Sequence, residues 1–329
     1  MFLQISWFFD NTILKFHLNH TPEKFDFQIT HENPCFLIGS CFAENMAQKL
    51  QEHLFPVHFS PNGILFNPES MLQSLTTIIG NNAFDESFII ERDGLWYSFL
   101  HHSAVHASDK KKLLEKIHKT QQEAHGCLKT SKFLIITFGT AFVYEHKTFQ
   151  RVVSNCHKQP GSIFEKKFLE PEVIVEAYQR LIQKLRVFNP DLNIIFTVSP
   201  VKYLKDGLEN NSRSKASLLL AVNRLVNTNA NAHYFPAYEL QNDDLRDYRF
   251  YKEDLAHPNA QAIDYIWEKF AASAFSEKTQ TINLEIAKLN AALAHRKLNK
   301  AEEGDKKLQT YIDQQKEKIK ALAPGLLFP

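Results

Sequence analysis

Three short apolar runs constrain the fold of this chain most. They occupy residues 35–39, 133–138 and 193–198, and polar or turn-forming residues follow each of them. Strands of a parallel sheet have this nearly continuous apolar character because helices cover both of their faces. Amphipathic stretches lie between the runs. The pattern predicts an α/β domain with a mainly parallel sheet and helices on both faces.

The amphipathic stretches have apolar residues at helical spacing. In the first of them Met46, Leu50 and Leu54 recur every four residues. Pro171 suits the first turn of its helix. Backbone N–H groups in a first turn have no acceptor within the helix, so the N–H that proline lacks is not needed there. The expected helices span residues 43–54, 69–79, 109–128, 171–187, 214–230 and 259–275. A further short strand is expected at 233–235.

The last fifty or so residues differ from the rest, because their apolar residues define two separate helical faces. The faces are formed by Ile282, Ile286, Leu289 and Leu293, and by Leu308, Ile312, Ile319 and Leu322. Gly304 and its charged neighbours are expected to separate them. We therefore divide the chain into an N-terminal extension (1–14), an α/β domain (15–275) and a C-terminal helical hairpin (276–329). The hairpin could dock on the domain or join two copies in a homodimer.

The composition excludes several classes of partner. The chain has 38 Lys and Arg against 37 Asp and Glu, which gives no electrostatic argument for nucleic acid or an anionic membrane. No apolar stretch reaches the length of a bilayer span. Residues 1–9 are apolar but lack the basic start and cleavage site of a signal peptide. These features favour a cytoplasmic protein with free thiols.

Cofactor and metal motifs are also missing. The closest two of the ten glycines, Gly126 and Gly139, stand thirteen positions apart. The dinucleotide fingerprint, the P-loop and the G-x-S-x-G elbow all need closer pairs. No Cys-x-x-Cys pair occurs, and His102 and His106 lack a third ligand at metal spacing. We expect neither a cofactor nor a metal.

Three segments at strand ends carry residues suited to catalysis. In an open parallel sheet, sites form at the carboxyl ends of strands. Cys41 follows the first strand at a helix start, where free N–H groups lower a thiol pKa and can hold an oxyanion. Gly139 and Thr140 follow the second run. Asp254 and His257 precede the last helix of the domain, and this spacing can place a carboxylate against one imidazole nitrogen, leaving the other as a base.

The segment Gly39-Ser40-Cys41-Phe42-Ala43 spells the motif of the GSCFA domain family, which is grouped with the SGNH (GDSL-like) hydrolases. The resemblance continues through 62–68, 139–144, 155–158, 197–201 and 254–258, and it covers roughly residues 15–275. It implies a flavodoxin-like, three-layer α/β/α fold and acyl-ester chemistry, and the helical tail is similar to a usual companion of the domain. It does not imply a substrate.

The hydrolase motif G-D-S-L matches residues 39–42 most naturally with Cys41 as the nucleophile. The alternative alignment uses Ser40. In either case the resemblance implies His257 as the base and Asp254 as the residue that orients it.

The resemblance also implies an oxyanion hole made by the nucleophile N–H, the Gly63 N–H and an asparagine amide. The asparagine block falls at 139–141, where asparagine is absent. Thr140 or Asn67 could donate instead. Losing one such donor typically lowers the rate about 10²–10³-fold.

The segment Asn155-Cys156-His157-Lys158 has two interpretations. Cys156 or His157 could line the same pocket and replace the missing asparagine, while Lys158 could bind an anionic substrate. The segment could equally be an ordinary polar loop. A disulfide between Cys41 and Cys156 is not expected in a reducing cytosol. Lys202, Arg213 and Lys215 near the third strand end could hold an anionic group or form a solvated face.

Two functions follow as expectations. The first is an acyl esterase or acyltransferase acting on a small-molecule or carbohydrate ester, where the carbohydrate rests on SGNH analogy alone. The second is a non-catalytic binding or scaffold protein that retains the fold.

Overall fold

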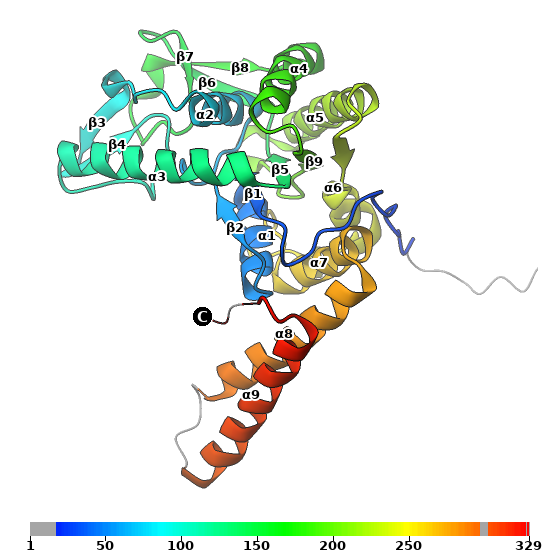
Figure 1. Ribbon diagram of the computed structural model, residues 1–329. Coiled ribbons are helices and arrows are strands. Elements are labelled where there is room, and N and C mark those ends of the chain that lie inside the picture. Colours follow the sequence, from blue (N-terminus) through cyan, green and yellow to red (C-terminus); the bar gives the residue numbers. More distant parts are fainter. Residues whose placement is uncertain (1–17, 297–301, 327, 329) are drawn as a thin grey trace, which may run out of the picture.

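The computed structural model describes residues 18–296, 302–326 and 328. The expected N-terminal extension at 1–14 lies outside these residues. The centre of the α/β domain is a five-stranded parallel sheet with the strand order β10-β9-β5-β1-β2 (Figure 1). Its strands are β1 (Cys35–Gly39), β2 (Val57–Phe59), β5 (Phe133–Phe138), β9 (Asn193–Val198) and β10 (Ala232–Tyr234). This is the doubly wound order of flavodoxin-like sheets.

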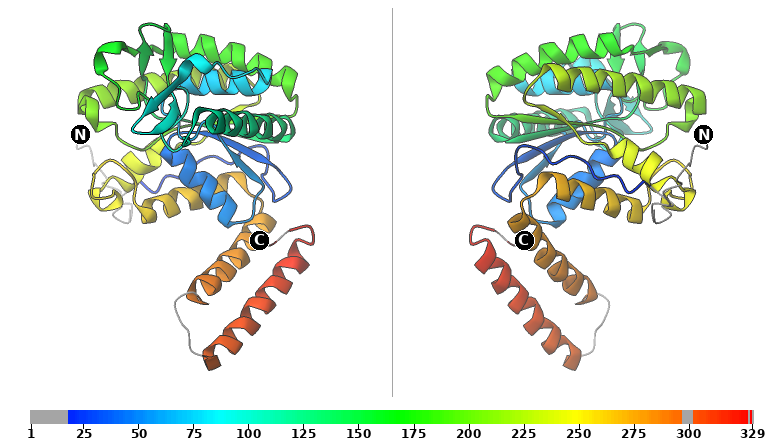
Figure 2. Two further views of the ribbon diagram at one scale, coloured as in Figure 1. Left: turned by 90° about the vertical axis from the view of Figure 1, so that its left-hand side faces the viewer. Right: turned by 90° about the vertical axis from the view of Figure 1, so that its right-hand side faces the viewer.

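Helices cover both faces of this sheet (Figure 2). Phe36 and Ile38 of β1 face one core, and Cys35 and Leu37 face the other, because side chains alternate along a strand. The first core contains α2 (Pro68–Gly80), α3 (Lys110–Thr130), α4 (Pro171–Phe188) and α5 (Leu208–Thr228). The second contains α1 (Cys41–Glu52) and α7 (Ala260–Ala274). Each large apolar side chain buried in this way contributes about 1.5–3 kcal/mol.

The predicted strands and helices of the domain are present, with shifted ends. α1 begins two residues before the predicted start, at Cys41 itself. α5 begins at Leu208 rather than 214, directly after Gly207, whose φ of +84° ends the preceding turn. Apart from the exposed Leu208, the residues before Ser214 are polar, so apolar periodicity does not reveal the start of this helix.

Two small antiparallel sheets were not predicted. One joins β3 (Ile89–Arg92) to β4 (Leu95–Ser98), and the other contains β6 (Phe142–His146), β7 (Arg151–Val153) and β8 (Phe164–Phe168). Phe88, Phe99, Val153 and Phe164 form a separate core beneath both. The sheet of β6–β8 follows the end of β5 and supplies walls of the site described below.

Short helical segments complete the domain. They are α6 (Ala237–Glu239) and the turns Glu86–Phe88, Gly161–Ile163, Leu204–Asp206, Leu240–Leu245 and Tyr248–Phe250.

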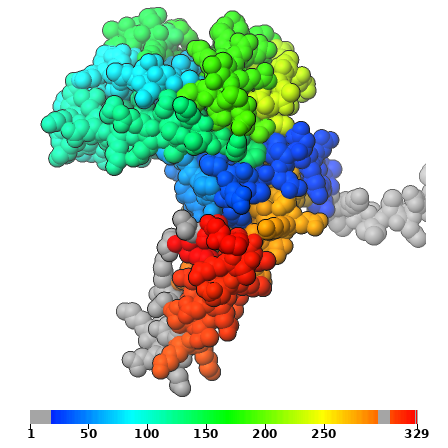
Figure 3. Space-filling view, in the orientation of Figure 1, coloured from blue at the N-terminus to red at the C-terminus, as the bar shows by residue number. Residues whose placement is uncertain are grey.

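Two long helices, α8 (Glu277–Arg296) and α9 (Glu302–Leu322), project from the domain side by side (Figures 1 and 3). Both predicted apolar faces lie in the core between them, in which Ile286 and Ile319 are fully buried. Gly304 lies inside α9, so it does not separate the helices as expected.

α8 is hydrogen-bonded to the α/β domain along its first four turns. Asn290 Nδ2 donates to the Glu52 carbonyl at 2.7 Å, and Asn283 Oδ1 lies 3.1 Å from His31 Nε2. None of the described helices has the length and apolar character needed to cross a membrane.

Candidate functional site

The chain turns sharply between β1 and α1. Gly39 has a φ of +150°, and a Cβ atom at this position would lie 2.5 Å from the Thr137 carbonyl oxygen of β5. Only glycine is compatible with this conformation and this close approach. Ser40 is extended and precedes the first helical residue, Cys41. The predicted strand–turn–helix arrangement is therefore present, with Cys41 at the start of the helix.

The strand ends of β1, β5 and β9 meet the loop that carries His257 in one pocket of about 290 Å³. We call it the thiol pocket. The predicted residues Ser40, Cys41, Gly139 and His257 all line it. The remaining described lining residues are Phe66, Ser199, Val201, Lys202, Tyr203, Leu204 and Lys205.

Ser40 and Cys41 differ in their access to this pocket. Ser40 is 2% exposed, and its Oγ is buried without a hydrogen-bond partner among the described atoms. The Cys41 side chain is partly exposed. Backbone N–H groups of Cys41 and Phe42 act on its sulfur, as expected at a helix start, where N–H groups have no partner within the helix.

The expected lowering of the Cys41 pKa is wrong. Burial raises the pKa of the thiol above its usual value, and this outweighs the N–H groups of Cys41 and Phe42 that favour the thiolate. The helix start was visible in the sequence, whereas the packing that desolvates the sulfur was not. At neutral pH the thiol is therefore protonated, and a reaction at this sulfur requires a base.

Iodoacetamide is expected to label Cys41 far faster than Cys35. Cys35 is 1% exposed, and burial raises its pKa to about 12. Since only the thiolate reacts, both rates should rise with pH. Peptide mass spectrometry after timed labelling measures the two rates, with the partly exposed Cys127 as a reference thiol. Equal labelling of Cys35 and Cys41 would contradict this picture of the pocket.

Asp254 and His257 form the predicted pair. Asp254 Oδ2 lies 2.6 Å from His257 Nδ1, while Oδ1 accepts the N–H groups of Ala256 and His257 at 2.9 Å each. These N–H groups, that of His257 first, lower the pKa of Asp254 to about 2. An ionised carboxylate can only accept, so a neutral His257 ring carries its proton on Nδ1 and leaves Nε2 free to act as a base.

Two further backbone hydrogen bonds hold the loop of His257. The Lys252 N–H donates to the His257 carbonyl at 2.7 Å, and the Lys202 N–H donates to the Ala256 carbonyl at 3.1 Å. The second bond ties the loop to the segment after β9, which also lines the thiol pocket.

Lys215 lies directly behind the strand ends. It is 1% exposed, and its Nζ donates to the carbonyls of Gly139 at 2.7 Å and Ser199 at 2.6 Å. It therefore connects the ends of β5 and β9. Burial lowers its pKa to about 7, against a smaller opposing effect of Cys41. Sequence analysis placed Lys215 near this strand end but missed that it is buried.

Arg213 and Lys202 lie nearby but have other surroundings. The Arg213 guanidinium stacks over Phe168 at 5.4 Å, and the Lys202 ammonium lies 3.8 Å from the ring centre of Tyr251. Of these two cations, only Lys202 is among the described residues of the thiol pocket.

Most of the expected oxyanion donors are already engaged. The Gly63 N–H donates to the Ser60 carbonyl at 3.0 Å, and Gly63 is absent from the described lining of the thiol pocket. The N–H groups of Gly139 and Thr140 both donate to the Phe66 carbonyl at 2.9 Å. The role expected for the Gly63 N–H is thus wrong, because local turn bonds use it. The N–H groups of Cys41 and Phe42 are the donors that face the sulfur.

A second cavity of about 480 Å³ adjoins the thiol pocket. We call it the aromatic pocket. The two share Phe66, Tyr203 and Lys205 in their walls. Five predicted binding residues line the aromatic pocket, namely Asn67, Thr140, Asn155, Cys156 and Lys158. Rings of Phe142, Tyr144 and Phe164 complete the aromatic part of its lining, and its other described residues are Val153, Ser154, Gln159 and Gly161.

His157 does not belong to either pocket, so its expected role is wrong. It is 4% exposed, and its Nε2 lies 2.8 Å from the Ser98 carbonyl oxygen. Its ring packs at 5.0 Å against Tyr97 of the small β3–β4 sheet. Neighbouring residues in a sequence point in different directions when the backbone turns, and His157 and Lys158 both have positive φ angles.

Two of the other predicted residues have structural bonds as well. Asn67 Oδ1 caps α2 by accepting the Ser70 N–H at 2.8 Å. Thr140 Oγ1 accepts the Phe142 N–H at 3.1 Å and lies 3.2 Å from Ser214 Oγ.

The cysteines Cys35, Cys41, Cys127 and Cys156 are all free thiols. In the part of the chain that the structure describes, no three His, Cys, Asp or Glu side chains cluster in a way that could hold a metal ion. Burial lowers the pKa of His101 to about 3, which keeps its ring neutral.

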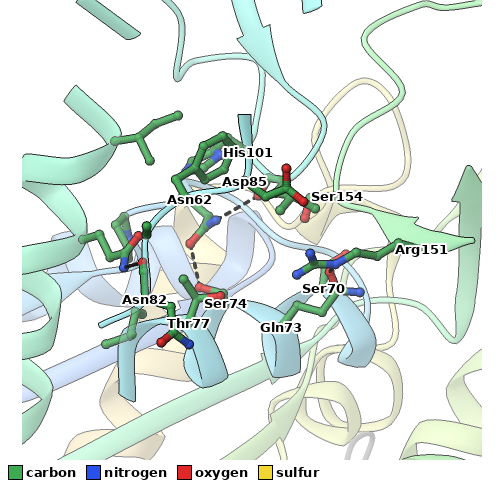
Figure 4. A pocket seen from close by; sticks show the side chains of 17 residues that line it. Asn62, Ser70, Gln73, Ser74, Thr77, Asn82, Asp85, His101, Arg151 and Ser154 are labelled. Atoms are coloured by element: carbon green, nitrogen blue, oxygen red, sulfur yellow. Dashed lines mark hydrogen bonds between the residues drawn. The ribbon is translucent and has the colours of Figure 1, made fainter. Parts of the chain in front are cut away.

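A third cavity of about 190 Å³ lies between α2, α3 and the loops near His101 (Figure 4). Its polar groups largely bond one another. Ser74 Oγ donates to Asn62 Oδ1 at 2.6 Å, and Asn62 Nδ2 donates to the Leu100 carbonyl at 2.9 Å. Arg151 Nε donates to Gln73 Oε1 at 2.9 Å. This bonding gives Asn62, the first residue of the segment 62–68, a structural role.

Comparisons with known proteins assign the domain to a family. No curated protein matched the chain. The family model described as GSCFA family matches residues 34–270. That range begins just before β1, contains both pockets and the Asp254–His257 pair, and ends within α7. Because the match covers most of the chain, this protein belongs to the GSCFA family.

Proposed function

We propose that this protein is an acyl esterase or acyltransferase in which Cys41 is the nucleophile and His257 is the base. One observation carries the proposal: a partly exposed thiol with two helix-start N–H groups shares a pocket with an imidazole whose other nitrogen is bonded to a carboxylate. Covalent catalysis uses a nucleophile and an oriented base that meet the substrate in one pocket.

In the first half of the reaction, His257 Nε2 takes the proton from Cys41 Sγ, and the sulfur attacks the acyl carbonyl carbon. The carbonyl oxygen becomes an oxyanion, which the N–H groups of Cys41 and Phe42 stabilise. Collapse of this intermediate breaks the ester bond, leaves a thioester on Cys41 and releases the alcohol, which takes its proton from His257. Asp254 stabilises the transient imidazolium.

In the second half, water or an acceptor hydroxyl attacks the thioester and gives its proton to His257. The acid or the new ester leaves, and the proton returns to the Cys41 sulfur. The choice between hydrolysis and transfer depends on which hydroxyl reaches the thioester. Because the nucleophile must stay reduced, the mechanism requires a reducing compartment, and we propose the cytoplasm.

Ser40 is the alternative nucleophile. Its Oγ is buried, whereas the Cys41 side chain reaches the pocket surface, and an attacking atom must contact the substrate. This difference in access favours Cys41.

We propose an O-acylated carbohydrate as the substrate. The thiol pocket has a mainly apolar wall that suits an acyl chain. The aromatic pocket next to it combines rings with the amides of Asn67 and Asn155, and such sites bind a ring while orienting its hydroxyl groups.

A substitution of the base tests the mechanism. His257→Ala is expected to lower kcat/KM for p-nitrophenyl and O-acetyl sugar esters about 10²-fold, the lower end for general acid–base catalysis, because water can reach this ring, which is 42% exposed. Asp254→Asn should have a smaller effect in the same direction. His118→Ala is the matched control, since its ring lies on the exposed side of α3, where it is hydrogen-bonded to Gln122.

Turnover that survives unchanged in His257→Ala would remove the assignment of the base. Thioester formation can be followed separately, by intact mass, as an acyl adduct on Cys41.

A non-catalytic binding or scaffold protein is the second candidate. It is favoured by the engagement of the Gly63 and Thr140 N–H groups and by the projecting helices α8 and α9, which could join two copies. Under this hypothesis no ester in the panel is turned over, and the chain is dimeric in sedimentation measurements.

A further inference from the structure

The thiol pocket and the aromatic pocket adjoin each other, and we refer to the two together as the cleft. They share Phe66, Tyr203 and Lys205, so a ligand can extend from one into the other. Lys158, Lys202 and Lys205 line the cleft. No Asp or Glu occurs among its described lining residues. The lining is therefore cationic although the whole chain is nearly neutral.

These three lysines have no carboxylate partner in the part of the chain that the structure describes. Within the described residues, no carboxylate oxygen lies within 4.0 Å of their ammonium groups. Lys202 lies over the ring of Tyr251 at 3.8 Å, and Lys205 lies 5.8 Å from the ring centre of Tyr144. Aromatic faces position such cations without neutralising them. Their charges remain available to a ligand.

Three of the acidic groups near the cleft, Asp206, Asp254 and Glu145, have partners of their own. Asp206 pairs with Lys166, and Asp254 accepts bonds from His257 and two N–H groups. Glu145 pairs with Lys167 at 2.8 Å. Glu44 on α1 raises the pKa of Cys41, but it does not line either pocket in the described structure. The buried Lys215 adds a further basic group behind the strand ends.

From this juxtaposition we infer that the substrate is an anionic acyl ester, with a carboxylate or phosphate group on the alcohol part that lies beside Lys205 and Lys158. The inference rests on the proposed function and specifies its substrate. In this arrangement the acyl group occupies the apolar thiol pocket next to Cys41. The ring of the alcohol part lies across Tyr203, and its anionic group reaches the lysines of the aromatic pocket. An acylated sugar acid and an acylated sugar phosphate both have this chemistry.

A matched set of substrates tests the inference: O-acetyl glucose, O-acetyl glucuronate and O-acetyl glucose 6-phosphate. The wild type is expected to prefer the anionic esters in kcat/KM. Lys205→Gln and Lys158→Gln should each reduce that preference about 2- to 5-fold, since an ion pair between exposed groups is worth up to about fivefold in affinity. Raising the salt concentration should reduce the preference as well. The two anions distinguish carboxylate from phosphate.

Lys129→Gln is the control, because Lys129 lies at the end of α3, outside the lining of both pockets. It should leave the preference unchanged. The inference is overturned if the wild type turns over neutral and anionic esters equally, or if Lys205→Gln reduces both alike.

Failure of the proposed function gives a different result. Calorimetric binding of glucuronate and glucose 6-phosphate, measured against glucose with the intact chain, needs no turnover. If the anions bind in a way that depends on Lys205 but no ester is turned over, the proposed enzymatic activity is rejected and the inference of an anionic ligand is retained. If esters are turned over with no preference for anions and no anion binding, the proposed enzymatic activity is retained and the inference of an anionic substrate is rejected.

Discussion

Cys41→Ala is expected to lower ester turnover by a factor on the order of 10⁴ or more and to abolish the acyl adduct. Removing the nucleophile lowers the rate about as much as removing nucleophile, base and orienting carboxylate together. Without the sulfur, the base has no attacking atom to activate. The pocket itself should persist, since alanine fits at the start of a helix. Initial rates with p-nitrophenyl acetate and intact mass after quenching measure the effect.

Two matched variants test whether the effect is specific to Cys41. Cys156→Ala removes a thiol from the adjoining pocket, and it should retain turnover within a few-fold. Ser40→Ala removes a buried hydroxyl that has no bond to lose among the described atoms, so the enzyme should stay active. An inactive Ser40→Ala with an active Cys41→Ala would assign the nucleophile to Ser40.

Lys215→Met is expected to destabilise the fold, and the effect should grow with pH. The Lys215 pKa is about 7 in the fold against 10.5 for an ordinary lysine, so the unfolded chain binds the extra proton between these values. The free energy of unfolding of the wild type therefore rises with pH across that range, and methionine removes this dependence. We expect the difference between the two proteins to increase by about 3 kcal/mol from pH 7 to pH 9.5.

The hydrogen bonds of Lys215 explain why the variant is less stable where the amine is neutral. Without Nζ, the buried carbonyls of Gly139 and Ser199 lose their donor, at a cost of about 1–3 kcal/mol each. Urea unfolding at pH 7 and at pH 9.5 measures the difference, with the exposed Lys129→Met as the control. A difference that does not change with pH would show that Lys215 is not desolvated in the native state.

Local sequence was sufficient to predict the frame of the domain. β1, β5 and β9 are continuous apolar runs, and the helices between them have one apolar face, so both patterns can be read within a window of a few residues. The antiparallel strands β3, β4 and β6–β8 are three to five residues long. They depend on the core of Phe88, Phe99, Val153 and Phe164, which brings together residues far apart in the chain.

The features of the site also divide into those that local sequence predicts and those that depend on the tertiary structure. Asp254 and His257 are three positions apart, so a single turn places Oδ2 beside Nδ1, and their pairing could be predicted. Gly63 and His157 have the residue types expected of a site, but hydrogen bonds to Ser60 and Ser98 direct them elsewhere. Those bonds depend on the path of the backbone, which residue type does not reveal.

The sequence by itself determined the turn after β1, the helix that follows it and the Asp254–His257 pair, because each depends on neighbours within a few residues. Only the tertiary structure decided that burial raises the Cys41 pKa, that Lys215 joins the ends of β5 and β9, and that three lysines line one cleft. Desolvation and shared cavities arise where distant segments pack together, and no local pattern encodes that packing.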